Sequence, residues 1–186
     1  IDNENYYDLL DGHYLELKEY TKQTEAGIVY NNIIVSVVGE GAEGNYQIDY
    51  ARTGRIYVRR RPIKLVTQDY VNVYDGTEQS DTYTYTNADA DMYADTLSED
   101  GKTTFMTVLP QHTLFAYDRA TILNVNNGVP VENEIFFLIR DENGDDVTPN
   151  YDYESYIKYG TLTLQKRKIK VQLHHVKWAY DEKVHY

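Results

Sequence analysis

One sequence pattern occurs twice in this chain, and the repeat constrains the fold more than any other feature. Residues 54–77 (GRIYVRRRPIKLVTQDYVNVYDGT) align without gaps with residues 160–183 (GTLTLQKRKIKVQLHHVKWAYDEK), at an offset of 106 residues. Six residue types recur at matched positions: Gly54 and Gly160, Arg61 and Arg167, Ile63 and Ile169, Lys64 and Lys170, Tyr74 and Tyr180, and Asp75 and Asp181. An internal repeat of this length predicts successive copies of one structural unit.

The match continues upstream with an offset that shrinks in steps. Towards the N-terminus the offset falls to 105, 102 and 99 residues at three further pairs: Tyr46 with Tyr151, Val29 with Val131, and His13 with His112. Each step lies in a stretch rich in Gly, Asn or Asp, which is typical of surface loops that tolerate insertions. The phase predicts an incomplete unit over 1–59 (its C-terminal two thirds), a complete unit over 60–165, and the first strands of a following unit over 166–186.

The repeat unit has the patterning of β-strands. The runs IIVSVV (33–38) and IFFLIR (135–140) are short, apolar and bounded by turn residues, whereas GRIYV and GTLTL alternate with period two. Twenty tyrosines add to the strand-forming bias. The phase of the alternation shifts between Val58 and Ile63, so the basic run between them must hold a bulge, a turn or a change of sheet. We expect an all-β fold.

The order of the motifs resembles that of a known family. An Asn-Tyr pair, then YGTLTL or TGRIYV, then KRKIKV or RRPIKLV, then VYDGT is similar to the YDG/MBG-type tandem repeats of large cell-surface proteins of Gram-positive bacteria. The likeness covers nearly the whole chain and is clearest over 141–171. It departs at Glu182, which replaces a glycine and so disfavours a turn with positive φ.

The resemblance implies a fold and a location. The fold would be a series of tandem Ig-like β-sandwich repeat modules, with β-grasp-like repeats as the alternative. The location would be extracellular, at a bacterial cell surface or in a secreted protein, where such modules form stalks and are sometimes linked to adhesion to glycans or mucin. The start at Ile1, with neither an initiator Met nor a signal peptide, indicates an excerpt or a processed product.

Charge argues against two classes of partner. The formal net charge is -12, which opposes binding to nucleic acid and to anionic membranes. No apolar run approaches the roughly 18 residues needed to span a bilayer. We therefore expect no nucleic-acid partner and no membrane insertion of this segment.

Basic residues gather in two runs at matched positions of the repeat. These runs hold eight of the eighteen basic residues: Arg59, Arg60, Arg61 and Lys64, and Lys166, Arg167, Lys168 and Lys170. We interpret them as junctions between units, where they pair with acidic loops of the adjacent repeat such as 75–101. The alternative is a solvated linker, in which each exposed ion pair contributes only about 0–1 kcal/mol.

Two acidic stretches are candidates for calcium. Asp141, Asn143 and Asp145 alternate as in the first half of a calcium loop, which uses oxygen ligands. An Asn-Gly hairpin turn at 143–144 accounts for the same residues without a metal. Residues 87–95 (NADADMYAD) form a second acidic loop with the same two interpretations. No other cofactor is expected.

The sequence does not favour an enzyme, and its aromatic residues admit two interpretations. Cysteine is absent, as are the Gly-x-Ser-x-Gly, phosphate-loop and His-Glu-x-x-His motifs. Tyr83 and Tyr85 lie on one face of a predicted alternating strand over 82–86, and Trp178 is the single tryptophan. These three rings could stack on a glycan or contact a host protein. The alternative for the tyrosines is packing in the core.

The missing part of the first unit predicts a free sheet edge. Residues 1–59 lack the counterpart of about 61–99, and an unpaired edge is a template for another strand. One interpretation is a window from a longer array of repeats. The other is head-to-tail self-association, in which Lys168–His175 of one chain adds a strand to residues 1–59 of the next. The expected function is a stalk, spacer or fibre-forming segment, and the alternative is an adhesin module.

Overall fold

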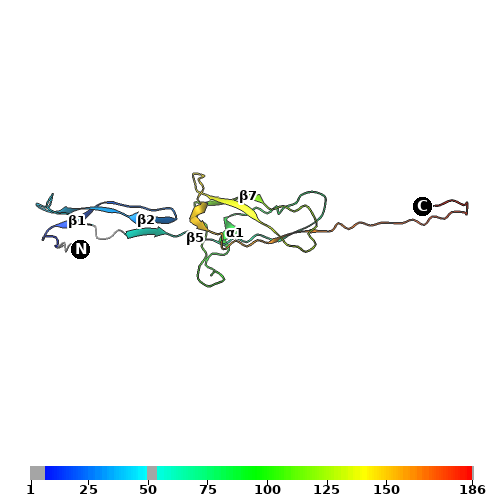
Figure 1. Cartoon of the computed structure of the whole chain (residues 1–186), viewed down its shortest axis with the longest axis horizontal. Helices are drawn as coiled ribbons and strands as arrows, with labels where there is room; N and C mark the ends of the chain where they lie inside the picture. The colour runs from blue at the N-terminus through cyan, green and yellow to red at the C-terminus, as the bar shows by residue number, and fades with distance from the viewer. Residues whose placement is uncertain (1–6, 50–53, 186) are drawn as a thin grey trace, which may run out of the picture. The chain divides into compact units, whose positions relative to one another are not determined.

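The computed structural model describes residues 7–49 and 54–185, and its described part is all-β (Figure 1). The strands are β1 (Tyr14–Tyr20), β2 (Gly27–Asn31), β3 (Ile33–Val38), β4 (Gly54–Val58), β5 (Arg61–Pro62), β6 (Tyr70–Val73), β7 (Thr113–Arg119), β8 (Val131–Glu132), β9 (Ile135–Arg140), β10 (Tyr151–Asp152) and β11 (Thr161–Gln165). The helical elements of this part are a five-residue α1 (Asn87–Asp91) and a 3-10 turn η1 (Thr148–Asn150).

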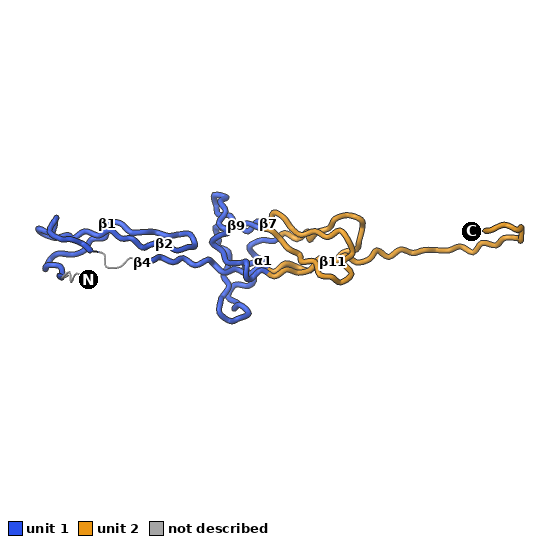
Figure 2. Tube along the Cα trace, viewed as in Figure 1, with its two compact units in different colours: residues 1–65, 85–115, 137–157 blue, residues 66–84, 116–136, 158–186 orange. Residues whose placement is uncertain are grey.

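The chain forms two compact units, each built from separate stretches (Figure 2). Unit 1 comprises residues 1–65, 85–115 and 137–157, and unit 2 comprises 66–84, 116–136 and 158–186. Strands β1 to β5 and β10 belong to unit 1, and β6, β8 and β11 belong to unit 2. These units group the residues that pack together in space, and their bounds are not those of the sequence repeat. The predicted division at 59/60 and 165/166 therefore stays a prediction.

The strands recur at the offsets of the sequence repeat. Strand β1 lies 99 residues before β7, and β3 lies 102 residues before β9, with identical lengths in each pair. Strand β1 pairs with β3, as β7 pairs with β9. We call residues 7–58 the first copy and residues 109–165 the second copy.

The strand register recurs as well. In the first copy β2 pairs with β4 in antiparallel fashion, with Val29 opposite Ile56. In the second copy β8 pairs with β11 in antiparallel fashion, with Val131 opposite Leu162. Both residues of the second pair are the repeat counterparts of the first. Because a one-residue slip would turn every side chain to the other face, the shared register shows that the same apolar pattern directs both pairings.

Residues 60–74, which we call the leading segment, add two parallel strands to the second copy. Strand β5 pairs with β10, with Arg61 opposite Tyr151. Strand β6 pairs with β11, with Tyr70 opposite Leu162 and Val73 opposite Gln165. The chain thus changes sheet between β4 and β5, at Arg59 and Arg60. This change of sheet accounts for the shift of apolar phase in the basic run.

Each unit has its own buried side chains. In unit 2, Ile122, Leu162 and Leu164 form a cluster against which Tyr70 and Val131 pack. In unit 1 the buried apolar residues include Ile63 and Leu65 of the leading segment. Several other buried residues of unit 1 come from the second copy and the loop before it: Tyr85, Ala90, Phe105, Val108, Leu114, Phe137, Ile139 and Tyr151. The leading segment is therefore part of the core.

Three sequence expectations fail in detail. Residues 82–86 form no strand, because after the isolated bridge between Gln79 and Ile122 the chain runs on into α1. The predicted acidic loop over 87–95 is helical in its first part, 87–91, because Thr86 and Asp89 form a capping box that starts α1, and only 92–95 form a turn. Glu182 does adopt a positive φ, of 60°.

The turn at Glu182 repeats the geometry of the glycine turn despite the different residue. Asp181 Oδ1 accepts a hydrogen bond from the Lys183 N–H at 3.1 Å, as Asp75 Oδ1 accepts one from the Thr77 N–H at 2.9 Å. In both turns the aspartate side chain holds the backbone two residues ahead, which explains why the motif survives the loss of its glycine.

Acid is expected to weaken the parallel pairing of β6 with β11. Asp69 accepts hydrogen bonds from the Thr161 N–H (2.8 Å) and hydroxyl (2.9 Å), and these bonds hold the pKa of its carboxyl below the ordinary value. Because the pKa is lowered in the folded chain, the stabilisation is complete above the unfolded pKa of about 3.9 and is lost as the pH falls through the folded pKa.

Urea unfolding at pH 6 and at pH 3 measures this loss. Asp69→Asn is expected to lose less stability between the two pH values than the unsubstituted chain. Glu142→Gln, which removes an exposed carboxylate, should keep the full loss. Equal losses in all three proteins would contradict the assignment.

Candidate functional site

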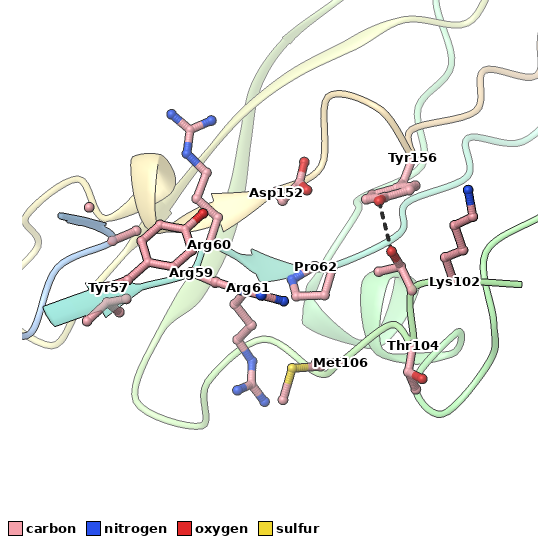
Figure 3. A pocket seen from close by; sticks show the side chains of 14 residues that line it. Tyr57, Arg59, Arg60, Arg61, Pro62, Lys102, Thr104, Met106, Asp152 and Tyr156 are labelled. Carbon is pink, nitrogen blue, oxygen red and sulfur yellow. Dashed lines mark hydrogen bonds between the residues drawn. The ribbon is translucent and has the colours of Figure 1, made fainter. Parts of the chain in front are cut away.

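A cavity of about 900 Å³ opens beside the first basic run (Figure 3). One part of its wall is the end of β4 with the four residues that follow it, Arg59 to Pro62. The remainder comes from residues 102–104 and Met106, from Asp152 and Tyr156, and from Ala26 and Gly27 where β2 starts. All of these residues belong to unit 1. The cavity therefore lies where the first copy runs into the leading segment.

The charged side chains around the cavity are mainly basic. Four are positive and one is negative: Arg59, Arg60, Arg61 and Lys102, and Asp152. This sign is opposite to the net charge of the chain, which is -12. A planar guanidinium offers paired N–H donors that match a carboxylate or a sulfate, so the arrangement can hold an anionic group.

The arginines make different contacts. Arg61 is held in place, because its Nε donates to the Thr107 carbonyl at 2.5 Å and its second terminal nitrogen donates to the Thr107 hydroxyl at 3.3 Å. The Arg59 guanidinium lies 5.8 Å from the centre of the Tyr57 ring, a cation–π contact. Arg60 has no ion pair or hydrogen bond within the described residues, so its guanidinium is the one most available to a ligand.

The opposite wall supplies aromatic and hydroxyl groups. The Tyr156 hydroxyl donates to the Thr103 hydroxyl at 3.4 Å, the dashed line in Figure 3. The ring of Tyr156 meets that of Phe105 edge to face, with centroids 4.9 Å apart. Phe105 is buried, so the Tyr156 ring packs against the core of unit 1. The wall can present an aromatic face next to the cationic one.

The basic runs do not form the predicted ion pairs with acidic loops in the described part of the chain. Ion pairs in this part include Lys18–Glu16, Lys102–Asp100 and His185–Asp181, and none of these involves a residue of the two basic runs. Lys64 contacts aromatic rings instead, with its Nζ 4.9 Å from the centre of the Tyr93 ring. The second run lies in a segment without strand pairing, and its basic residues are exposed: Lys166, Arg167, Lys168 and Lys170.

A histidine–tyrosine contact recurs in both copies and was not predicted from the sequence. In the first copy the Tyr46 hydroxyl lies 2.7 Å from His13 Nδ1 and accepts from the Leu10 N–H at 3.2 Å. His13 Nε2 lies 2.9 Å from the Glu40 carbonyl oxygen, which can only accept. In the neutral ring the proton is therefore on Nε2, and Nδ1 accepts the hydrogen bond from the hydroxyl.

The second copy forms the same contact. The Tyr151 hydroxyl lies 2.8 Å from His112 Nδ1 and accepts from the Leu109 N–H at 3.1 Å. The rings meet edge to face, 5.9 Å apart, compared with 5.5 Å for His13 and Tyr46. Burial raises the pKa of the Tyr151 hydroxyl. The signal in the sequence was the recurrence of one histidine and one tyrosine at fixed places in the repeat. The contact fastens the start of each copy to its later part.

The three aromatic candidates for binding differ in solvent exposure. Tyr85 is 2% exposed, so its ring is closed to a ligand and belongs to the core. Tyr83 is partly exposed. Trp178 is 60% exposed and stacks on His185, with ring centres 4.4 Å apart and planes at 10°. Tyr85 therefore cannot share an exposed binding surface with Tyr83 and Trp178.

The calcium candidates form a turn whose oxygens bind backbone N–H groups. Asp141 Oδ1 accepts from the Asn143 and Asp145 N–H groups, each at 2.9 Å. These bonds, that from Asp145 above all, lower the pKa of the Asp141 carboxyl. Gly144 has a φ of 87° and donates to the Asp141 carbonyl at 3.0 Å, which closes the turn. Over residues 7–49 and 54–185, no three His, Asp or Glu side chains converge as metal ligands.

The acidic residues around α1 are also engaged within the protein. Asp91 Oδ1 accepts from the Val108 N–H at 2.6 Å, and Asp89 accepts from the Thr86 N–H at 2.7 Å. The side chain of Asn87 bridges two backbone groups, the carbonyl of His112 and the N–H of Leu114. These residues tie the helix to the start of β7.

Comparison of the chain with protein-family models, with characterised proteins and with solved structures gives no match. None of the helices in the described part of the chain combines the length and apolar character needed to traverse a lipid bilayer.

Loss of the tyrosine hydroxyl is expected to weaken the second copy more than the first. Tyr151→Phe leaves the Leu109 N–H and His112 without their partner in a buried site, which should reduce the free energy of unfolding by about 1–3 kcal/mol. Tyr46→Phe should cost less because Tyr46 is only half-buried. Urea denaturation followed by fluorescence measures both, and Tyr180→Phe is the matched control, because Tyr180 is 91% exposed.

Proposed function

We propose that this chain is a structural segment of an extracellular protein of a Gram-positive bacterium, made of tandem Ig-like β-sandwich modules. It acts as a stalk, spacer or fibre-forming element, at the cell surface or after secretion, and it catalyses no reaction. The resemblance to YDG/MBG-type repeats supports the location. The recurrence of strands, register and the histidine–tyrosine contact supports a modular architecture.

One observation carries the mechanical role, namely that β6 of the leading segment and β11, the last strand of the second copy, are neighbours and run in parallel. Strand β6 of the leading segment pairs with β11, and four residue pairs are in register. The chain enters β6 at one end of this pair and leaves β11 at the other. Tension along the chain therefore slides the two strands past each other and loads all their hydrogen bonds together, rather than opening them one by one.

The flanking contacts add to this resistance. The Tyr74 N–H donates to the Gln165 carbonyl at 3.0 Å, and the Thr67 N–H donates to the Lys158 carbonyl at 2.9 Å. Asp69 binds both the N–H and the hydroxyl of Thr161. The contact between the two strands thus extends beyond the paired residues at both ends.

Single-molecule force spectroscopy tests the mechanical role. The chain has no cysteine, so handles at Arg60→Cys and Lys166→Cys pull the two strands from opposite ends. Handles at Val73→Cys and Gln165→Cys pull the same pair from one end, because these residues are opposite each other. We expect a several-fold higher unfolding force in the first geometry. Equal forces would contradict the proposed mechanical role of the β6–β11 pair.

A second candidate function is favoured by the cationic cavity, and it is that of an adhesin module. Its ligand would be a glycan or a host protein that presents a carboxylate or sulfate to Arg59 and Arg60, with the Tyr156 face beside it. Trp178 and Tyr83 are further exposed aromatic groups available to a sugar ring. No resident cofactor is proposed, and the turn at Asp141 does not support calcium, because Asp141 Oδ1 already accepts two backbone hydrogen bonds.

A glycan array containing sulfated, sialylated and neutral oligosaccharides tests the adhesin. A spacer is expected to give no specific signal. An adhesin should bind acidic glycans, with loss of the signal in Arg60→Ala and retention in Lys183→Ala, an exposed basic residue that does not line the cavity. Loss of the signal in Trp178→Ala or Tyr83→Ala instead would move the site to the exposed aromatic rings.

A further inference from the structure

The leading segment covers specific residues of the second copy, and these contacts define what a docked strand needs. The Asn133 amide donates to the Gln68 carbonyl at 2.7 Å. The backbone of Gln68 and Asp69 passes directly over Gly160, where an added β-carbon would lie 2.4 Å from the Gln68 carbonyl group. Gly160 has no positive φ, so close approach of the incoming strand is the reason for its glycine.

The first copy keeps the same residues without the strand. Gly54 is the counterpart of Gly160, yet among the described residues a β-carbon there would meet nothing closer than the Asn31 side chain at 3.6 Å. Asn31 is the counterpart of Asn133, and its exposed amide has no hydrogen bond within the described residues. Strand β4 has a single partner, β2, among these residues. A glycine that nothing covers is explained if a strand docks over it.

Residues 166–180, which we call the C-terminal segment, have the sequence of a leading segment but none of its contacts. Ile63 and Leu65 are both 0% exposed, whereas their counterparts Ile169 and Val171 are 83% and 74% exposed. In Figure 1 this segment carries no strand arrow. Its apolar residues are thus displayed without a partner in the described structure.

We infer that the C-terminal segment of one chain docks as parallel strands on the first copy of a second chain, covering Gly54. This inference rests on the proposed function and names its partner, which is another copy of the same protein. Each chain offers one donor and one acceptor at different places, so the contact is head to tail and propagates into a filament.

The pairing within the second copy gives the register. Strand β6 opposite β11 translates into four pairs along β4: Ile56 with Val176, Tyr57 with Lys177, Val58 with Trp178, and Arg59 with Ala179. Strand β5 opposite β10 translates into Tyr46 with Arg167 and Gln47 with Lys168. The Asn31 amide then faces the His174 carbonyl, as that of Asn133 faces Gln68.

Charge favours this occupant. The C-terminal segment has five basic residues and no acid, whereas residues 7–58 have eight acidic and four basic residues. Attraction between opposite charges accelerates encounter and disfavours docking of acidic strands. The two partners are therefore complementary in hydrogen bonding, in shape at the glycine and in charge.

Two variants of the full chain, each defective on one side, test the inference. Gly54→Ala blocks the acceptor, and because its β-carbon has room in the free chain, the melting temperature should not change. Ile169→Asp blocks the donor, and Val184→Asp, at a residue 76% exposed, is its matched control. Sedimentation velocity over a concentration series is expected to show self-association of the unsubstituted chain and of Val184→Asp, and its loss in the other two.

Mixing the two defective variants gives the decisive result. Each retains the half that the other lacks, so the mixture should form dimers and nothing larger. A mixture that stays monomeric, or single variants that still associate, would overturn the inference. A monomeric but more compact unsubstituted chain would also overturn it, because the segment would then dock within its own chain.

Cross-linking tests the register. A short bismaleimide should join Tyr57→Cys of one variant to Lys177→Cys of another as a dimer of twice the mass, and should fail with Lys183→Cys. The force measurement uses only residues 60–166, so it is independent of this contact. If the second copy unfolds only at high force but the chain never self-associates, the docking inference alone is overturned. If the chain self-associates but the second copy unfolds at low force, the mechanical role alone is overturned.

Discussion

The parallel contact between the leading segment and β11 is the interaction on which the rest of the structure depends. It places Leu162 and Leu164 in the interior of unit 2, beside Tyr70. It also requires the glycine at 160 and the buried amide of Asn133. Where the contact is absent, in the first copy, the corresponding strand has a single partner among the described residues and its apolar side chains are less buried.

The sequence predicted the all-β class and the place where the chain changes sheet, because both depend on local periodicity. The shift of apolar phase around Arg59–Arg60 corresponds to the passage from β4 to β5. It also located the repeat, whose offsets coincide with the spacing of equivalent strands. Alternating apolar residues fix which face of a strand is buried, and this information is local.

Periodicity could not reveal contacts that depend on distant partners. Tyr83 and Tyr85 share a pattern, yet one is partly exposed and the other is buried, and residues 82–86 form no strand on which alternation would place them on one face. The cationic cavity is lined by residues from four separate stretches of the chain, so no single sequence motif predicts it. The histidine–tyrosine contact joins residues 33 and 39 positions apart, and only their recurrence in both copies hinted at it.

The order of strands along the chain also governs when the second copy can be completed during synthesis or export. Tyr70 and its partner Leu162 are 92 positions apart, so β6 must wait while most of the copy emerges behind it. Pairings of such high contact order form slowly, because a long loop must close before any bond is gained. Until β11 has formed, β6 therefore stays without its strand partner, and an unpaired strand edge is open to association with other chains.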